Sequence, residues 1–186
     1  MTRFIGFICS LVIGLILTIP IIVISILIFL RDNEYPIYIS SRVGKNNKIF
    51  RMPKFRTMKS TTPQQASHLL SNPDDYLLST GSFLRKYSLD ELPQIFSIIR
   101  GDMSFVGPRP ALYNQYDLIK DRDKLNISKL SPGITGWAQV NGRDELSIEE
   151  KVKFDAEYLE KASWSFDMYI IWLTIIRVLK KDGVSH

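Results

Sequence analysis

The sequence predicts an α/β protein that is mainly helical and is attached to a membrane by its N-terminal segment. Three observations support this fold class. Residues 4–30 form an apolar run without a charge, a short stretch after it alternates polar and apolar residues as in a β-hairpin, and helical patterns separated by turns follow. We therefore divide the chain into a membrane segment, residues 1–31, and one domain of ordinary size, residues 32–186.

The apolar run, FIGFICSLVIGLILTIPIIVISILIFL, is longer than the roughly 20 residues that a helix needs to cross a bilayer. A cleaved signal peptide is not expected, because its apolar region would be shorter and would end in a small-residue cleavage site. Pro20 lacks a backbone donor and therefore kinks or breaks the helix. The pattern leaves two alternatives open: a kinked spanning helix, and a re-entrant hairpin whose arms are residues 4–19 and 21–30.

A β-hairpin is predicted next. Its arms are residues 35–41 and 48–58, they flank a turn at Gly44, and Pro53 limits the second arm to a sheet edge or a bulge. Residues 59–82 are rich in polar and turn-forming residues, which predicts a loop with one helical turn near 66–70.

Helices are predicted for most of the remaining chain. Residues 92–99 and 111–121 carry helical patterns, whereas 137–140 is typical of a short strand between turns. The capping-box pattern of residues 147–150 begins a helix that continues to about Lys161. The final segment, 166–181, fits two alternatives, an interfacial membrane helix or an ordinary core helix with a basic end.

Composition narrows the possible chemistry. The net charge is +5 and the pI is about 9.3, so anionic lipid, phosphorylated substrates and nucleic acid are all candidate partners. The chain has one cysteine and two histidines, His68 and His186, which excludes a disulfide framework and a zinc cluster. Carboxylates, lysines and arginines must therefore do any chemistry, and the basic domain is expected on the cytoplasmic side.

Asp90 and Glu91 form the most suggestive pair of carboxylates. Pro93 is tolerated in the first turn of a helix, which predicts Asp90 as the N-cap and Glu91 as the first helical residue. The pair can simply stabilise a helix end by about 1 kcal/mol. Alternatively, it can serve a phosphate site, since Arg85 lies just upstream and helix N-termini attract anions.

Several basic residues are candidate phosphate ligands. Lys54 lies on the second arm of the hairpin, Arg109 is fixed between two prolines, and Arg143 follows an Asn-Gly turn. Each can equally be a solvated surface charge, but fixed guanidinium groups suit phosphate oxygens, and together these residues suggest a diphosphate substrate. Asp155 is most simply a helix-surface acid paired with Lys151.

Four motifs resemble one known family closely. They are Lys54-Phe-Arg-Thr-Met58, Ser88-Leu-Asp-Glu-Leu-Pro-Gln94, Gly101-Asp-Met-Ser-Phe-Val-Gly-Pro-Arg-Pro110 and Pro132-Gly-Ile-Thr-Gly-Trp-Ala-Gln-Val-Asn-Gly-Arg143. Their order and sequence resemble the bacterial sugar transferase family, the small monotopic polyprenyl-phosphate phosphoglycosyl transferases. The match covers nearly the whole chain, including the apolar segment broken by proline.

The resemblance implies a mechanism and a set of site residues. Asp90 and Glu91 would be the catalytic dyad. Asp90 would attack the β-phosphorus of a UDP-sugar, release UMP and become a phospho-sugar aspartyl ester. The phospho-sugar would then be transferred from Asp90 to undecaprenyl phosphate. An aspartate is already ionised at pH 7, so this chemistry needs no histidine. Glu91 would hold Mg²⁺. The residues implied to line the site are Lys54, Arg85, Arg109, Arg143 and Asp155.

The resemblance also implies a location and a pathway. It favours the re-entrant hairpin, on the cytoplasmic face of the bacterial inner membrane among phospholipids, and the initiating step of a surface glycan such as exopolysaccharide or lipopolysaccharide. No nucleic acid partner is then expected. The alternative function is a non-catalytic basic module that binds anionic lipid or nucleic acid. Which UDP-sugar is used, and whether the chain is a monomer or a homodimer, is left open by the sequence.

Overall fold

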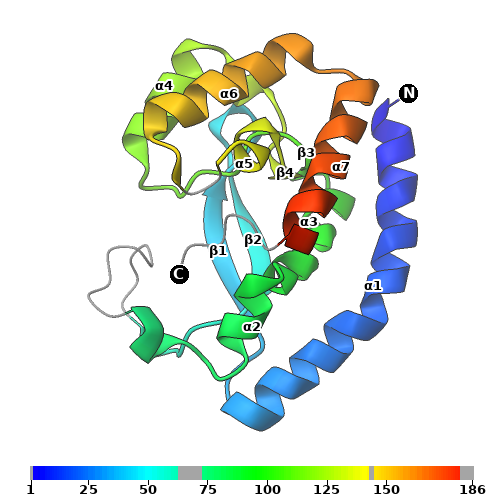
Figure 1. Cartoon of the computed structure of the whole chain (residues 1–186), viewed down its shortest axis with the longest axis vertical. Helices are drawn as coiled ribbons and strands as arrows, with labels where there is room; N and C mark the ends of the chain where they lie inside the picture. The colour runs from blue at the N-terminus through cyan, green and yellow to red at the C-terminus, as the bar shows by residue number, and fades with distance from the viewer. Residues whose placement is uncertain (1, 63–72, 143–144, 181–186) are drawn as a thin grey trace.

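The computed structural model describes residues 2–62, 73–142 and 145–180. A long N-terminal helix, α1, runs along one side of a body made of shorter helices and two two-stranded sheets (Figure 1). The expected mainly helical protein with a short hairpin and one apolar N-terminal helix is therefore confirmed. The helical turn predicted near residues 66–70 lies outside the described residues.

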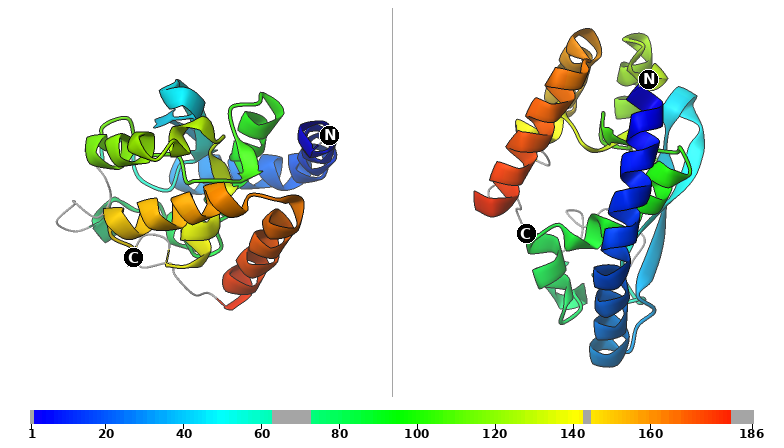
Figure 2. Two further views of the ribbon diagram at one scale, coloured as in Figure 1. Left: turned by 90° about the horizontal axis from the view of Figure 1, so that it is seen from above. Right: turned by 90° about the vertical axis from the view of Figure 1, so that its right-hand side faces the viewer.

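Helix α1 (Thr2–Asp32) contains Pro20 and bends near its middle (Figures 1 and 2). The proline lacks a backbone donor, and the hydroxyl of Thr18 donates to the Gly14 carbonyl at 2.9 Å, a pattern that also favours bending. The helix is continuous rather than split into two arms. Its portion from Ser10 to Asp32 is long and apolar enough to cross a membrane by length and composition.

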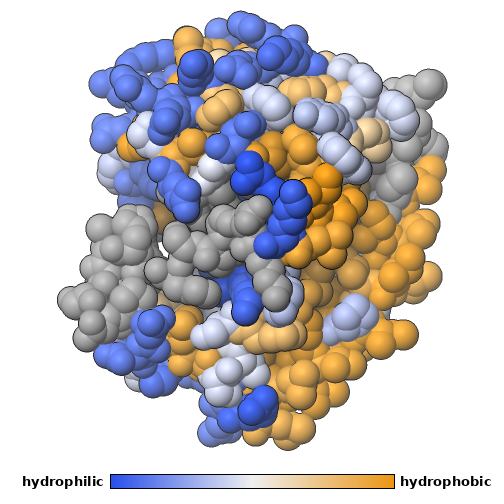
Figure 3. Space-filling model, in the orientation of Figure 1, coloured by the Kyte–Doolittle hydropathy of each residue, from blue (hydrophilic) through white to orange (hydrophobic). Residues whose placement is uncertain are grey.

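Only one side of α1 packs against the body. Ile28 is fully buried and Ile21 nearly so, and both belong to the largest apolar core. By contrast, Leu15 and Leu30 are 76% and 73% exposed. Helix α7 (Trp164–Lys180) behaves similarly, because Ile170 is fully buried while its outer face is apolar and exposed. Figure 3 shows apolar residues gathered on the side that carries α1 and α7.

The predicted hairpin is confirmed. Strand β1 (Ile37–Val43) pairs antiparallel with β2 (Ile49–Phe55), in a register that places Pro53 opposite Ile39. The tight connection includes a 3₁₀ turn, η1 (Lys45–Asn47). A second sheet was not predicted: β3 (Ser104–Val106) pairs parallel with β4 (Gly133–Thr135). These three-residue strands carry no alternating pattern long enough to be read from the sequence.

Helices make up most of the chain after the hairpin. In chain order they are η3 (Pro73–Tyr76), α2 (Gly81–Lys86), η4 (Leu89–Gln94) and α3 (Ile95–Ile99), then α4 (Tyr116–Lys124), η5 (Ile127–Lys129), α5 (Trp137–Val140) and α6 (Ile148–Lys161). The expected strand at 137–140 is wrong, because the Val140 N–H donates to the Gly136 carbonyl and closes a helical turn. The capping box of Ser147 and Glu150 at the start of α6 is confirmed.

Candidate active site

The Asp90–Glu91 pair lies on η4, which packs against strand β2 and helix α2. The prediction that Asp90 is an N-cap is wrong. Ser88, in the left-handed conformation with φ of 53°, precedes a 3₁₀ helix, and both carboxylates lie inside that helix. Pro93 lies near the end of this 3₁₀ helix, and the α-helix α3 begins only at Ile95, so the proline did not mark the first turn of an α-helix that starts at Glu91.

Asp90 lies among the predicted basic residues. Burial raises the pKa of its carboxyl above the ordinary value, the neighbouring Glu91 carboxylate raises it further, and the charges of Lys54, Arg109 and Arg85 oppose the rise. The pKa of Lys54 is lowered by burial, and the Asp90 carboxylate opposes that shift. The packing agrees with these effects, because η4 contacts β2, which carries Lys54, and α2, which carries Arg85.

The two cations on the β2 and α2 side are held by local contacts. The Lys54 ammonium lies 5.7 Å from the ring centre of Tyr38, on the neighbouring strand. The Arg85 guanidinium donates through Nε to the Thr57 hydroxyl at 3.0 Å. Helix α2 can approach Thr57 this closely because it begins at Gly81, where any Cβ would collide with the Thr57 carbonyl.

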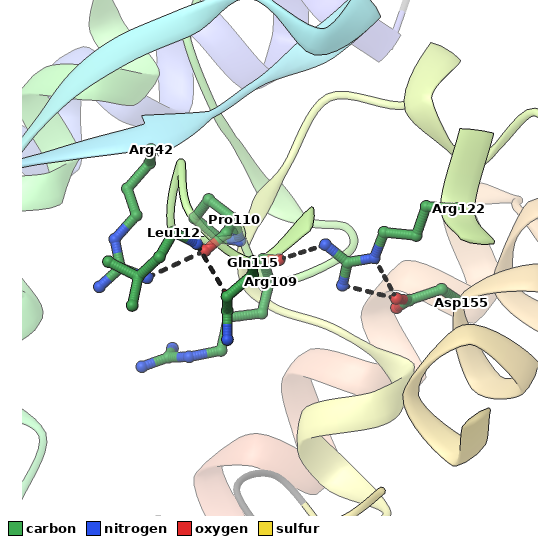
Figure 4. A network of polar contacts seen from close by, with 7 residues as sticks. All are labelled: Arg42, Arg109, Pro110, Leu112, Gln115, Arg122 and Asp155. Carbon is green, nitrogen blue, oxygen red and sulfur yellow. Dashed lines mark hydrogen bonds and ion pairs between the residues drawn. The ribbon is translucent and has the colours of Figure 1, made fainter. Parts of the chain in front are cut away.

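Arg109 follows β3 in the chain and contacts the pair through Glu91. Its Nη2 donates to Glu91 Oε1 at 3.0 Å, and the side chain of Glu91 is only 12% exposed. Its backbone is fixed as well. Arg122 donates through Nη1 to the Arg109 carbonyl at 2.8 Å, and Arg42 donates to the adjacent Pro110 carbonyl at 3.2 Å (Figure 4).

Asp155 lies on α6 and is connected through Arg122 to the backbone of Arg109. Its Oδ2 accepts from Arg122 Nη2 at 2.6 Å and from Nε at 2.9 Å, and the residue is 1% exposed (Figure 4). Burial raises the pKa of Asp155 and the Arg122 guanidinium opposes the rise. The simplest interpretation, a surface acid paired with Lys151, is therefore wrong, because α6 turns Asp155 toward α4. The structure connects Asp155 to Arg109 through Arg122.

A cavity of about 400 Å³ opens beside Glu91 and Arg109. Its apolar walls come from α1, η4 with α3, the β3–β4 sheet and α7. Of the described site residues that the sequence predicted, Glu91 and Arg109 line this cavity, whereas Asp90, Lys54, Arg85 and Asp155 do not. Arg143 lies outside the described residues. Sequence reasoning missed Gln139 and Arg177, which also line this cavity. A polar side chain within the apolar run Trp137–Val140 was the available signal for Gln139.

The described side chains offer limited ligands for a metal ion. Within residues 2–62, 73–142 and 145–180, no group of three or more His, Cys, Asp or Glu side chains is arranged to hold a metal ion. Mg²⁺ needs less, since it takes one or two carboxylates and completes its shell with phosphate oxygens and water. Glu91, a carboxylate that lines the cavity beside Asp90, fits that requirement. Binding of Mg²⁺ stays a prediction.

Comparisons with known proteins agree with the four motifs. The model of the bacterial sugar transferase family matches residues 1–181. The sugar transferase EpsL of Bacillus subtilis is 39% identical over 146 residues, which are 78% of this chain and 70% of that protein. The UDP-galactose-lipid carrier transferase of Erwinia amylovora is 38% identical over 183 residues, 90% of this chain and 38% of that protein.

A third relative is the UDP-glucose:undecaprenyl-phosphate glucose-1-phosphate transferase of Escherichia coli, 39% identical over 149 residues, 76% of this chain and 32% of that protein. The chain thus spans well under half the length of the Erwinia and Escherichia proteins, and most of EpsL. Because the family model covers nearly the whole chain, including the Asp90–Glu91 pair, this chain belongs to the bacterial sugar transferase family.

Proposed function

We propose that this chain transfers a phospho-sugar from a UDP-sugar to undecaprenyl phosphate, and so begins a surface glycan. The observation that carries the proposal is the convergence of Asp90 and Glu91 with Lys54, Arg85 and Arg109 in one site. Relatives named as UDP-galactose and UDP-glucose transferases to a lipid carrier support the substrate class.

In the first step, a carboxylate oxygen of Asp90 attacks the β-phosphorus of the UDP-sugar. An Asp–phosphorus bond forms, the bond from that phosphorus to the bridging oxygen breaks, and UMP leaves with the oxygen. In the second step, a phosphate oxygen of undecaprenyl phosphate attacks the same phosphorus and releases Asp90. Separating the two displacements keeps the two anionic substrates from having to meet in one step.

Three features of the site support Asp90 as the nucleophile. The residue lies inside the 3₁₀ helix and not at its N-cap, which is Ser88. Lys54, Arg85 and Arg109 favour its ionised form and can offset charge on the phosphoryl group. Mg²⁺ held by Glu91 would supply further charge neutralisation on the diphosphate when bound.

The membrane arrangement we propose is a re-entrant α1, which stays one helix but bends at Pro20 and keeps both ends at the cytoplasmic face of the bacterial inner membrane. Exposed apolar side chains on α1 and on α7 support insertion of both helices into one leaflet. Trp164, Tyr169 and Trp172 are 65%, 47% and 57% exposed, and aromatic residues are typical of the headgroup level. A protease-sensitive tag at the N-terminus tests this: cleavage from the cytoplasmic side only is expected, and cleavage from the periplasm means a spanning helix.

Release of UMP tests the reaction directly. Purified wild type should release UMP from at least one UDP-sugar when undecaprenyl phosphate is present, and Asp90→Asn should release none. Asp121→Asn is the matched control, because Asp121 is a partly exposed acid on α4 that pairs with Lys124 on the same helix. Full activity of Asp90→Asn would contradict the proposed mechanism.

A further inference from the structure

Gln139 is a buried amide that the structure leaves unsatisfied. The residue is 9% exposed, and neither Oε1 nor Nε2 has a hydrogen-bond partner in the part of the chain that the structure describes. Buried side-chain amides are nearly always paired, because taking a polar group out of water without a partner is costly. The side chain lines the same cavity as Glu91 and Arg109.

The local backbone holds this amide in place. Gln139 lies on the single helical turn α5, which begins directly after Gly136. A Cβ on Gly136 would lie 2.7 Å from Gln139 Oε1, and it would also collide with the Gly107 carbonyl. The amide oxygen therefore lies over a position that has no room for a Cβ, and the side chain forms part of the wall of the cavity.

The chemistry of an amide selects among the ligands of this site. An amide offers one acceptor and one donor group in a plane, so it is satisfied by a ligand that presents a donor and an acceptor side by side. A phosphate at neutral pH offers mainly acceptors, and an isoprenoid chain offers neither. Sugar hydroxyls and the imide edge of uracil both present such a pair, and both belong to a UDP-sugar.

We propose that Gln139 recognises the nucleotide sugar through two hydrogen bonds. Its amide Nε2 would donate to an acceptor of that ligand, and its Oε1 would accept from a neighbouring hydrogen-bond donor. This rests on the proposed function and deepens it by assigning a specificity-determining residue. Glu91 and Arg109 line the cavity that Gln139 also lines, so a ligand whose diphosphate lies beside Glu91 can extend its sugar or its base toward the amide.

Gln139→Leu removes both polar atoms at similar volume, and Gln115→Leu is the same substitution on an exposed residue outside the cavity. The assay compares kcat/KM for UDP-glucose, UDP-galactose and CDP-glucose, with the KM for undecaprenyl phosphate measured in parallel. In Gln139→Leu we expect the preference between donors to fall by about tenfold or more, since a site that hydrogen-bonds its substrate loses selectivity when the bond is removed. Gln115→Leu should keep the wild-type preference.

Which substrate preference weakens in Gln139→Leu identifies the group of the donor that hydrogen-bonds to Gln139. A weaker preference between the two UDP-sugars, with unchanged inhibition by UMP, assigns the sugar hydroxyls. A weaker preference for UDP-glucose over CDP-glucose, with weaker inhibition by UMP, assigns the uracil. If Gln139→Leu keeps both preferences, or changes only the KM for undecaprenyl phosphate, the inference is overturned.

Two further measurements separate this inference from the proposed function. Calorimetric titration of UDP-glucose and UDP-galactose into Asp90→Asn and into Asp90→Asn/Gln139→Leu reports donor binding without the covalent step, so it decides the role of Gln139 even if no UMP is released. Gln139→Leu should also melt at the wild-type temperature or above it, because the amide makes no internal hydrogen bond. A lower melting temperature would show an internal partner and would overturn the argument.

Discussion

Replacing Asp155 by asparagine should destabilise the protein far more than removing a surface acid. The substitution leaves the Arg122 guanidinium, whose side chain is 11% exposed, without its ionised partner. Breaking a buried ion pair by removing one partner costs about 3–5 kcal/mol, and the hydrogen bond that Arg122 keeps to the Arg109 carbonyl favours the lower end of that range.

The expected change in melting temperature follows from that cost. In a chain of this size, 1 kcal/mol corresponds to about 2–4 °C, so a loss of about 3 kcal/mol lowers the melting temperature by about 6–12 °C. Asp121→Asn is the matched control: its ion pair with Lys124 is also 2.6 Å long, but the two side chains are 38% and 61% exposed. Exposed pairs contribute about 0–1 kcal/mol, so the control should shift by a few degrees at most.

The assay is thermal unfolding of the purified protein in detergent, with UMP release measured well below both melting temperatures. Asp155→Asn should lower kcat as well, because Arg122 loses the carboxylate that orients its guanidinium while it donates to the Arg109 carbonyl. Equal shifts in melting temperature for the Asp155 and Asp121 variants would refute the idea that burial makes the Asp155–Arg122 ion pair more important for stability than an exposed pair. An unchanged kcat would refute its connection to Arg109.

Three further predictions concern other parts of the chain. Burial lowers the pKa of Lys54 below its ordinary value of 10.5, so the ammonium loses its proton at a lower pH than a free lysine, and kcat/KM should fall as the pH rises through that pKa. Lys54→Arg should move this fall to higher pH, and an unchanged pH profile would contradict the role of Lys54. Ser147→Ala should cost about 1 kcal/mol by removing the α6 cap, measured by thermal unfolding, and no loss would mean that the cap is not stabilising. Chelation by EDTA should abolish UMP release and Mg²⁺ should restore it, whereas activity that survives EDTA removes Glu91 from its metal-binding role.

Local sequence signals predicted the elements that local interactions build. The hairpin was predicted because the turn at Gly44 joins two alternating segments, and α6 was predicted because its capping box is complete within four residues. Strands β3 and β4 were missed because they pair across a separation of about 30 residues and are only three residues long. At Trp137–Val140, an apolar run too short for periodicity was read as a strand, whereas packing on α6 and α7 made it helical.

The same limit applies to the site. Motifs identified Asp90, Glu91 and their surrounding cations, but the sequence could not show that Asp155 pairs with Arg122, which lies 33 residues away on another helix. Nor could it show that Gln139 lacks a partner, since hydrogen-bond satisfaction depends on the whole surrounding structure. The N-cap assigned to Asp90 failed because Pro93 lies near the end of the 3₁₀ helix η4, and the α-helix α3 begins only at Ile95.

Mass spectrometry of the intact protein after incubation with a UDP-sugar, without undecaprenyl phosphate, tests the central claim most directly. The account predicts a burst of about one UMP per protein molecule, a mass increase equal to one phospho-sugar, and loss of that mass when undecaprenyl phosphate is added. Asp90→Asn should show neither the burst nor the mass increase. UMP release that requires the lipid from the outset, with no adduct on the protein, would contradict a covalent intermediate on Asp90.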